Sequence, residues 1–239
     1  MRELHLFCGG GGGVLGGMLL GHTCVCAVEI DAYCRKVLLQ RQRDGILPRF
    51  PIWDDVRTFD GVPWQSRVDV VCAGFPCQIH SHIGKMHGSV GFDGWPDTVR
   101  IISEIMPGRV FLENVPAILS NYWGRVIGDL ANLGYDTKWG VFCGPDAASN
   151  SPTIGARLFA LATAIEHRSQ TEEPFLAKRV QGWKPTLPSP ANRSGWTSEI
   201  PEPAIQRISD GMAEYVGELK AIGNGQIPSL AALAWRTLT

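Results

Sequence analysis

One cysteine stands where a buried strand is expected to end. The apolar run of residues 68–73, Val-Asp-Val-Val-Cys-Ala, leads into Gly74-Phe75-Pro76-Cys77-Gln78. In an open sheet of parallel strands, the residues just after the strands line the ligand-binding edge. A thiol there can act as a nucleophile if a nearby cation or a helix start lowers its pKa. Cys77 is therefore the candidate nucleophile.

A carboxyl group follows a second apolar run. Residues 109–112, Arg-Val-Phe-Leu, lead into Glu113-Asn114-Val115. If both runs are strands of one parallel sheet, the thiol of Cys77 and the carboxyl of Glu113 share one edge and one cleft. The carboxyl group could then donate or share a proton with a substrate under attack. An isolated glutamate at a strand end is otherwise a solvated residue or a helix cap.

The segments that would position these groups alternate between strand-like and helix-like patterns. This alternation is typical of an α/β fold with a doubly wound, mostly parallel sheet. Asp31 is expected to cap the second helix, and Gly134 to end the fourth. The expected strands are residues 4–7, 23–29, 68–73, 109–113, 135–142 and 157–162. The expected helices are residues 12–20, 32–42, 98–105, 122–133 and 229–238.

A proline-rich stretch interrupts this alternation after residue 162. It carries prolines at positions 174, 185, 188, 190, 201 and 203, which cannot continue the pattern. We therefore expect a main domain over residues 1–162, a small insert over 163–206, and a segment over 207–239 that returns to the main domain.

Composition indicates a single soluble, enzyme-sized unit. The chain has 239 residues, 44% of them hydrophobic, and a formal charge of -1, which excludes a disordered class. The apolar opening is short and broken by glycines, so we expect neither a signal peptide nor a membrane span. Seven cysteines without paired zinc spacing indicate reduced thiols and no structural zinc. We expect a cytoplasmic monomer of prokaryotic or viral origin that binds no metal.

Basic and aromatic residues gather in residues 174–198, which contain no acidic residue. Such a segment can contact phosphates. The near-neutral total charge does not itself indicate nucleic-acid binding, and an ordinary solvated loop explains the same composition equally well. The candidate DNA contacts are Lys178, Arg179, Lys184 and Arg193.

In their order and spacing, the cysteine and glutamate blocks resemble those of the cytosine-5 DNA methyltransferases. Four more blocks extend the resemblance over nearly the whole chain. They are Leu6-Phe7-Cys8-Gly9, Val28-Glu29-Ile30-Asp31, Arg157-Leu158-Phe159, and residues 219–228, Leu-Lys-Ala-Ile-Gly-Asn-Gly-Gln-Ile-Pro. The resemblance implies the Rossmann-like fold of methyltransferases that use S-adenosylmethionine. It also makes residues 1–162 the catalytic, cofactor-binding domain and residues 163–206 a small target-recognition region.

The resemblance further implies a reaction on double-stranded DNA, with S-adenosylmethionine as methyl donor and the target cytosine flipped out of the duplex. Cys77 would add to carbon 6, Glu113 would share a proton with N3, and Arg157 would be the cation beside the thiol. The implied cofactor residues are Phe7, Gly9, Gly11, Gly12, Glu29, Ile30, Asp55, Pro76 and Asn224. Besides the basic segment, the implied substrate and DNA contacts are Gln78, Ser81, Lys85 and Asn114.

Two features depart from the family pattern. Gly155 stands where the family has an arginine two residues before Arg157. This puts recognition of the substrate carbonyl and support of the loop in doubt, and another basic residue could substitute. The insert over residues 163–206 is short. Because few base contacts can fit in it, we expect a short or relaxed target sequence.

Three other functions are compatible with parts of the sequence. RNA, such as a transfer RNA, could replace DNA as the substrate. The glycine at position 155 would also suit a catalytically silent DNA-binding homologue. A nicotinamide dehydrogenase is suggested only by the glycine-rich turn, and it explains neither Cys77 nor Glu113.

Overall fold

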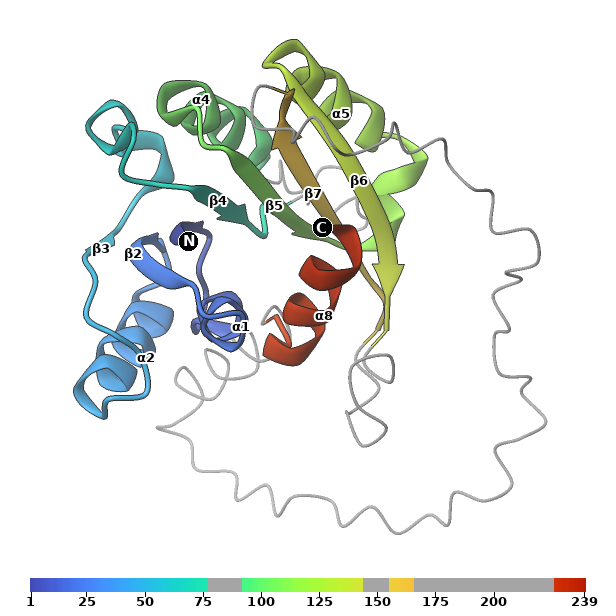
Figure 1. Ribbon diagram of the computed structural model, residues 1–239. Helices are drawn as coiled ribbons and strands as arrows, with labels where there is room; N and C mark the ends of the chain where they lie inside the picture. The colour runs from blue at the N-terminus through green and yellow to red at the C-terminus, as the bar shows by residue number, and fades with distance from the viewer. Residues whose placement is uncertain (77–91, 144–154, 166–225) are drawn as a thin grey trace, which may run out of the picture.

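Seven strands form one mixed sheet among the residues that the computed structural model describes, which are 1–76, 92–143, 155–165 and 226–239 (Figure 1). The strands are β1 (Arg2–Leu6), β2 (Thr23–Val28), β3 (Ile52–Trp53), β4 (Val70–Ala73), β5 (Arg109–Asn114), β6 (Tyr135–Phe142) and β7 (Arg157–Ala164). Their order across the sheet is β3-β2-β1-β4-β5-β7-β6. Strands β1 to β5 pair in parallel, whereas β7 runs antiparallel to both β5 and β6. The predicted mostly parallel sheet is confirmed.

Helices cover both faces of this sheet, as a doubly wound fold requires. They are α1 (Gly12–Leu19), α2 (Ala32–Arg43), α4 (Trp95–Ile105), α5 (Trp123–Asn132) and α8 (Pro228–Leu238). Helices α4 and α5 pack with Leu4 and Leu6 of β1 in one apolar cluster. Helices α1, α2 and α8 cover the opposite face.

The last helix, α8, packs against the first, α1, as well as against β6 and β7 (Figure 1). The two helices approach closely because Gly16 has no side chain: a Cβ atom there would lie 3.0 Å from the Cβ of Ala231. The C-terminal helix therefore belongs to the same layered unit as β1. The domain limits at residues 162 and 206 stay a prediction, since residues 166–225 lie outside the described part of the chain.

Local sequence signals explain several helix limits. The Asp31 carboxylate caps α2 by accepting two backbone N–H hydrogen bonds, at 2.9 and 3.1 Å. Gly134 follows α5 with a φ of 85°, in the region that favours glycine. Both predicted signals are confirmed. Helix α4 begins at Trp95 rather than at residue 98, because Pro96 lies in its first turn, where the missing N–H costs nothing.

Short elements connect the main ones and have no counterpart in the sequence pattern. They are β3 and the 3-10 helices η1 (Val56–Thr58), η2 (Val62–Trp64) and η4 (Pro116–Ser120). A strand of two residues shows no periodicity, and β3 exists because its backbone pairs with Ala27 and Val28 of β2. Among the helices of the described residues, none is both long enough and apolar enough to cross a membrane.

A buried polar cluster lies on the sheet face that α1 covers. The Glu3 carboxylate contacts Nε2 of His5 at 2.9 Å and Nδ1 of His22 at 2.7 Å. Burial raises the pKa of Glu3, but the hydrogen bonds and charges of the two histidines outweigh it, so the net pKa is lowered. The Sγ atom of Cys72 lies within 4.8 Å of a carboxylate oxygen of Glu3 and of a ring nitrogen of His5. This cluster joins β1, β4 and the start of β2 through polar rather than apolar contacts.

Candidate active site at the carboxyl edge of the sheet

Four parallel strands end at one edge of the sheet, and the antiparallel strand β7 begins there. Strands β1, β2, β4 and β5 share this edge through their parallel registers. Strand β7 starts at the same edge because Asn114, the last residue of β5, pairs with Leu158. The order of the strands reverses between β1 and β4. Ligands of open α/β sheets bind outside the carboxyl ends of the strands at such a reversal.

Glu113 and Arg157 meet at this edge as an ion pair. The Nε atom of Arg157 lies 3.1 Å from Oε1 of Glu113, and the side chains are 20% and 12% exposed, respectively. Burial raises the pKa of the Glu113 carboxyl, and the Arg157 charge and a hydrogen bond from the Gln226 side chain offset only part of that increase. The carboxyl group therefore holds its proton closer to neutral pH than an ordinary glutamate does.

Arg157 faces Glu113 and its own preceding backbone. Its Nη1 atom donates to the carbonyl oxygens of Gly155 and Ala156, at 3.2 and 3.4 Å. The sequence predicted that Arg157 is the cation beside Cys77. Because Cys77 lies outside the described residues, this role stays a prediction. The Arg157 contacts that the structure describes are with Glu113 and these two carbonyls.

Asn114 ties the end of β5 to the segment that precedes Cys77. Its Nδ2 atom donates to the carbonyl oxygen of Phe75 at 2.9 Å, and its Oδ1 atom accepts from the backbone N–H of Val115 at 2.9 Å. The side chain is buried. Because both ends of the amide are used, Asn114 fixes the path of the chain two residues before Cys77 relative to Glu113.

The glycine-rich turn after β1 is held against the end of β2. Gly9 and Gly11 have φ values of 57° and 91°, and Phe7, which is not glycine, has a φ of 54°. The Glu29 carboxylate accepts a hydrogen bond from the N–H of Gly9 at 2.6 Å and from that of Asp31 at 2.8 Å. Left-handed backbone at a non-glycine residue is strained and is concentrated at functional sites. The turn thus places the Glu29 carboxylate and the glycine backbone side by side at this edge of the sheet.

The ends of β1 and β4 converge at the start of α4. A Cβ atom on Gly94 would lie 2.7 Å from Cδ of Pro76 and 2.9 Å from Cζ of Phe7. The N–H of Gly94 also donates to the carbonyl oxygen of Pro76 at 3.1 Å. Gly94 therefore allows Phe7 and Pro76, both predicted cofactor residues, to lie together at the edge.

Two further predicted cofactor residues are surface-accessible. Ile30, next to Glu29, is 60% exposed and offers an apolar surface at the end of β2. The Asp55 carboxylate contacts the Arg57 guanidinium at 2.6 Å. Hydrogen bonds from the side chain and backbone of Arg57 lower the pKa of Asp55. Asp55 is therefore ionised, with its oxygens directed at Arg57.

Gln226 is a residue of this site that the sequence did not single out. Its side chain hydrogen-bonds Glu113, and its carbonyl oxygen would lie 2.1 Å from a Cβ atom on Gly12. The lack of a side chain at Gly12, predicted to serve the cofactor, thus makes room for the Gln226 backbone. The available signals were the place of Gln226 in the block of residues 219–228 and the unusual length of the glycine run.

Several predicted site residues lie outside the described part of the chain. They are Cys77, Gln78, Ser81, Lys85, Lys178, Arg179, Lys184, Arg193 and Asn224. Their assigned roles stay predictions.

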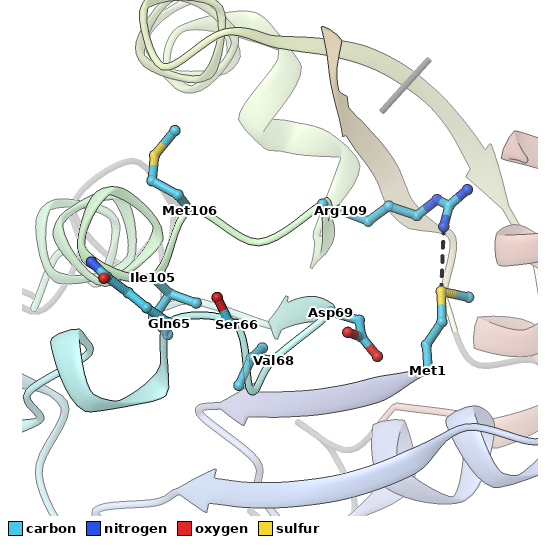
Figure 2. A pocket seen from close by; sticks show the side chains of 9 residues that line it. Met1, Gln65, Ser66, Val68, Asp69, Ile105, Met106 and Arg109 are labelled. Atoms are coloured by element: carbon cyan, nitrogen blue, oxygen red, sulfur yellow. Dashed lines mark hydrogen bonds between the residues drawn. The ribbon is translucent and has the colours of Figure 1, made fainter. Parts of the chain in front are cut away.

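A hollow of about 760 Å³ opens at the opposite edge of the sheet, where β4 and β5 begin. Arg109 and Met1 lie on one side of it (Figure 2), where Nη1 of Arg109 is 3.3 Å from the sulfur of Met1, and Asp69 lies nearby. This hollow is separated from Glu113 by the length of β5, whose first residue is Arg109. It does not contain any of the predicted site residues.

The sequence comparison identifies relatives that are all named as methyltransferases. A sequence profile described as C-5 cytosine-specific DNA methylase matches residues 1–151. The Type II methyltransferase M.Eco47II of Escherichia coli is 32% identical over 148 residues, which cover 58% of this chain and 33% of the relative. M.NgoMIV of Neisseria gonorrhoeae is 31% identical over 147 residues, covering 57% of this chain and 44% of the relative. The chain thus spans a third to less than half of the length of these relatives.

Solved structures share the fold. The DNMT2 structure from Spodoptera frugiperda has a TM-score of 0.57 at 18% identity and covers 72% of this chain and 53% of its own. The Dnmt2 methyltransferase of S. pombe has a TM-score of 0.54 at 18% identity, covering 69% and 49%. These similarities confirm the predicted methyltransferase fold. Because the profile also matches well over half of the chain, including Glu113 and the block around Cys77, the protein belongs to the C-5 cytosine-specific DNA methylase family.

Proposed function

We propose that the protein methylates carbon 5 of cytosine in double-stranded DNA. The observation that carries this proposal is the partly buried Glu113 carboxyl, which is paired with Arg157 and has a raised pKa. It lies beside a segment that Asn114 holds just before Cys77. Addition to a pyrimidine ring requires a nucleophile together with an acid that can share a proton with the ring. Membership in the methylase family supports the same reaction.

The proposed reaction uses Cys77 as nucleophile and Glu113 as acid. The Cys77 thiolate forms a bond to carbon 6, and Glu113 shares its proton with N3 as electron density builds there. Carbon 5 then becomes nucleophilic and accepts a methyl group. A base, for which bound water is the candidate, then takes the proton from carbon 5, and the electron pair of the sulfur–carbon bond returns to sulfur, which releases the product and restores the thiolate.

S-adenosylmethionine, when bound, supplies the electrophilic methyl group. The described residues suit this donor, since the Glu29 carboxylate beside the glycine turn can accept hydrogen bonds from ribose hydroxyls. The exposed Ile30 offers an apolar surface for the adenine ring. The remaining proposed contacts are Phe7, Gly9, Gly11, Gly12, Asp55, Pro76 and Asn224.

Duplex DNA is the proposed partner, bound by a monomeric, cytoplasmic protein of prokaryotic or viral origin. The proposed contacts are Gln78, Ser81, Lys85, Asn114, Lys178, Arg179, Lys184 and Arg193. Basic side chains would neutralise phosphates and thereby make binding weaker at higher salt.

Incubation with S-adenosylmethionine carrying a labelled methyl group tests the substrate. We expect label to enter duplex DNA as 5-methylcytosine and not to enter transfer RNA. DNA containing 5-fluorocytosine should capture the wild-type protein covalently, whereas the Cys77→Ser variant should form no adduct. Label in RNA alone would replace the proposed substrate. DNA binding without label or capture would instead identify a catalytically silent homologue.

Replacing Asn114 by alanine should slow methyl transfer to DNA about 10- to 100-fold, because a nucleophile misplaced by about 1 Å loses much of its rate. The variant also leaves the Phe75 carbonyl without its donor, which should cost about 1–3 kcal/mol of unfolding free energy. Single-turnover rates and urea unfolding measure the two effects. Asn132→Ala, at the exposed end of α5, is the matched control; an equal rate loss there would contradict the assignment.

A further inference from the structure

Three glycines, Gly12, Gly13 and Gly74, lie around the Gln226 side chain and backbone. A Cβ atom on Gly12 would lie 2.1 Å from the backbone oxygen of Gln226, and one on Gly13 would lie 2.7 Å from its Oε1 atom. A Cβ atom on Gly74, which follows β4, would lie 3.2 Å from its Nε2 atom. Any side chain at positions 12 or 13 would therefore displace Gln226, and one at Gly74 would crowd it.

The two ends of the Gln226 amide face different neighbours. Its Oε1 atom lies on the Gly13 side, where His5 Nδ1 would be 3.3 Å from the same Cβ position. Its Nε2 atom lies on the Gly74 side, where Oε2 of Glu113 would be 3.0 Å from the Cβ position. Arg157 contacts the other carboxyl oxygen, Oε1, at 3.1 Å. The Glu113 carboxyl thus lies between a guanidinium on one oxygen and an amide donor near the other.

We propose that Gln226 is a positioning residue for the Glu113 carboxyl, and that Gly12, Gly13 and Gly74 are required to admit it. The N–H of the amide donates to the carboxyl group, and a donor of this kind stabilises the ionised form and restricts rotation of the group. The catalytic consequence rests on the proposed function, whereas the contact with Glu113 does not.

Two groups act on the pKa of Glu113 besides its burial: the Arg157 guanidinium and the Gln226 amide. Arg157 on β7 is the facing charge. On the far side of Gln226 lie His5 and, bonded to it, Glu3, both on β1. A substitution of Gln226 that removes the N–H donor but keeps the side-chain volume therefore isolates the effect of this hydrogen bond on Glu113.

The Gln226→Met variant keeps the volume of the side chain but has no N–H donor. We expect the pKa of Glu113 to rise by about one pH unit, the effect of losing one hydrogen bond to a charged group. The Glu113-dependent limb of the methyl-transfer pH profile should move by the same amount. We also expect kcat to fall about tenfold, with KM little changed. Gly13→Ala should act in the same direction, because the added methyl group meets Oε1.

Carboxyl ¹³C NMR follows the titration of Glu113, with Glu113→Gln used to assign the resonance. Gln40→Met removes the same atoms from an exposed residue on α2 and should change neither the titration nor the pH profile. Lower stability in Gln226→Met without a shift in either measurement would overturn the proposal. If wild-type protein transfers no methyl group, the proposed function fails, yet the Glu113 titration still decides the role of Gln226.

Discussion

Glu113→Gln should slow methyl transfer to DNA about 10²–10⁴-fold, which is the usual contribution of a general acid. Glutamine keeps the size of the side chain and can still donate a hydrogen bond, but it cannot share a proton with N3. In the wild-type protein, burial raises the pKa of Glu113 despite the opposing Arg157 charge and the Gln226 hydrogen bond. The protonated form therefore persists at higher pH than for an ordinary glutamate, and the wild-type rate should fall once the pH exceeds this raised pKa.

Single-turnover rates across a pH series measure this effect, and calorimetry measures binding of S-adenosylmethionine. Donor binding should be unchanged, because Glu29 and the glycine turn are at the ends of other strands. Glu104→Gln is the matched control, since that carboxylate is also partly buried and paired with an arginine, at 2.7 Å from Arg100, but lies on α4. A Glu113→Gln variant with full activity and an unaltered pH profile would remove Glu113 from the reaction.

Local sequence signals were sufficient for most of the fold. Apolar runs alternating with helical periodicity predicted the main strands and helices, and Asp31 and Gly134 predicted helix limits that the structure has. The signals failed where an element depends on its neighbour. β3 is defined by pairing with β2, and the antiparallel direction of β7 follows from its place between β5 and β6. No residue pattern within β7 encodes that direction.

The candidate site was predictable only in part for the same reason. Glu113 stands at the end of an apolar run, so its place at the edge followed from the pattern. Its contacts with Arg157 and Gln226 depend on segments far along the chain that only the folded sheet brings together. Gly12 has a contact that the pattern did not predict: its lack of a side chain makes room for the backbone of Gln226. Its role toward the cofactor stays a prediction. Proximity across elements, rather than residue type, decided these roles.

Glu3→Gln should lower the free energy of unfolding by about 3 kcal/mol, since it weakens two hydrogen bonds to a buried charged group. Glu3 contacts His5 and His22 at 2.9 and 2.7 Å. A Cβ atom on Gly17 of α1 would lie 2.0 Å from its Oε2 atom, so the carboxylate also packs directly against the helix backbone. Urea unfolding at neutral pH measures the loss.

The pH dependence of the lost unfolding free energy tells whether Glu3 stabilises the fold through its charge or only through packing. The folded-state pKa of Glu3 is lowered from its ordinary value of 4.5. Its stabilising contribution is therefore fully present above about pH 4.5 and disappears as the pH falls through the lower folded value. The difference between wild type and Glu3→Gln should shrink over that interval. Asp69→Asn, which breaks an exposed pair with Arg2, should cost only about 0–1 kcal/mol. An equal cost for the two variants, or a Glu3→Gln cost that does not change with pH, would mean that the carboxylate charge does not stabilise the junction of β1 and α1.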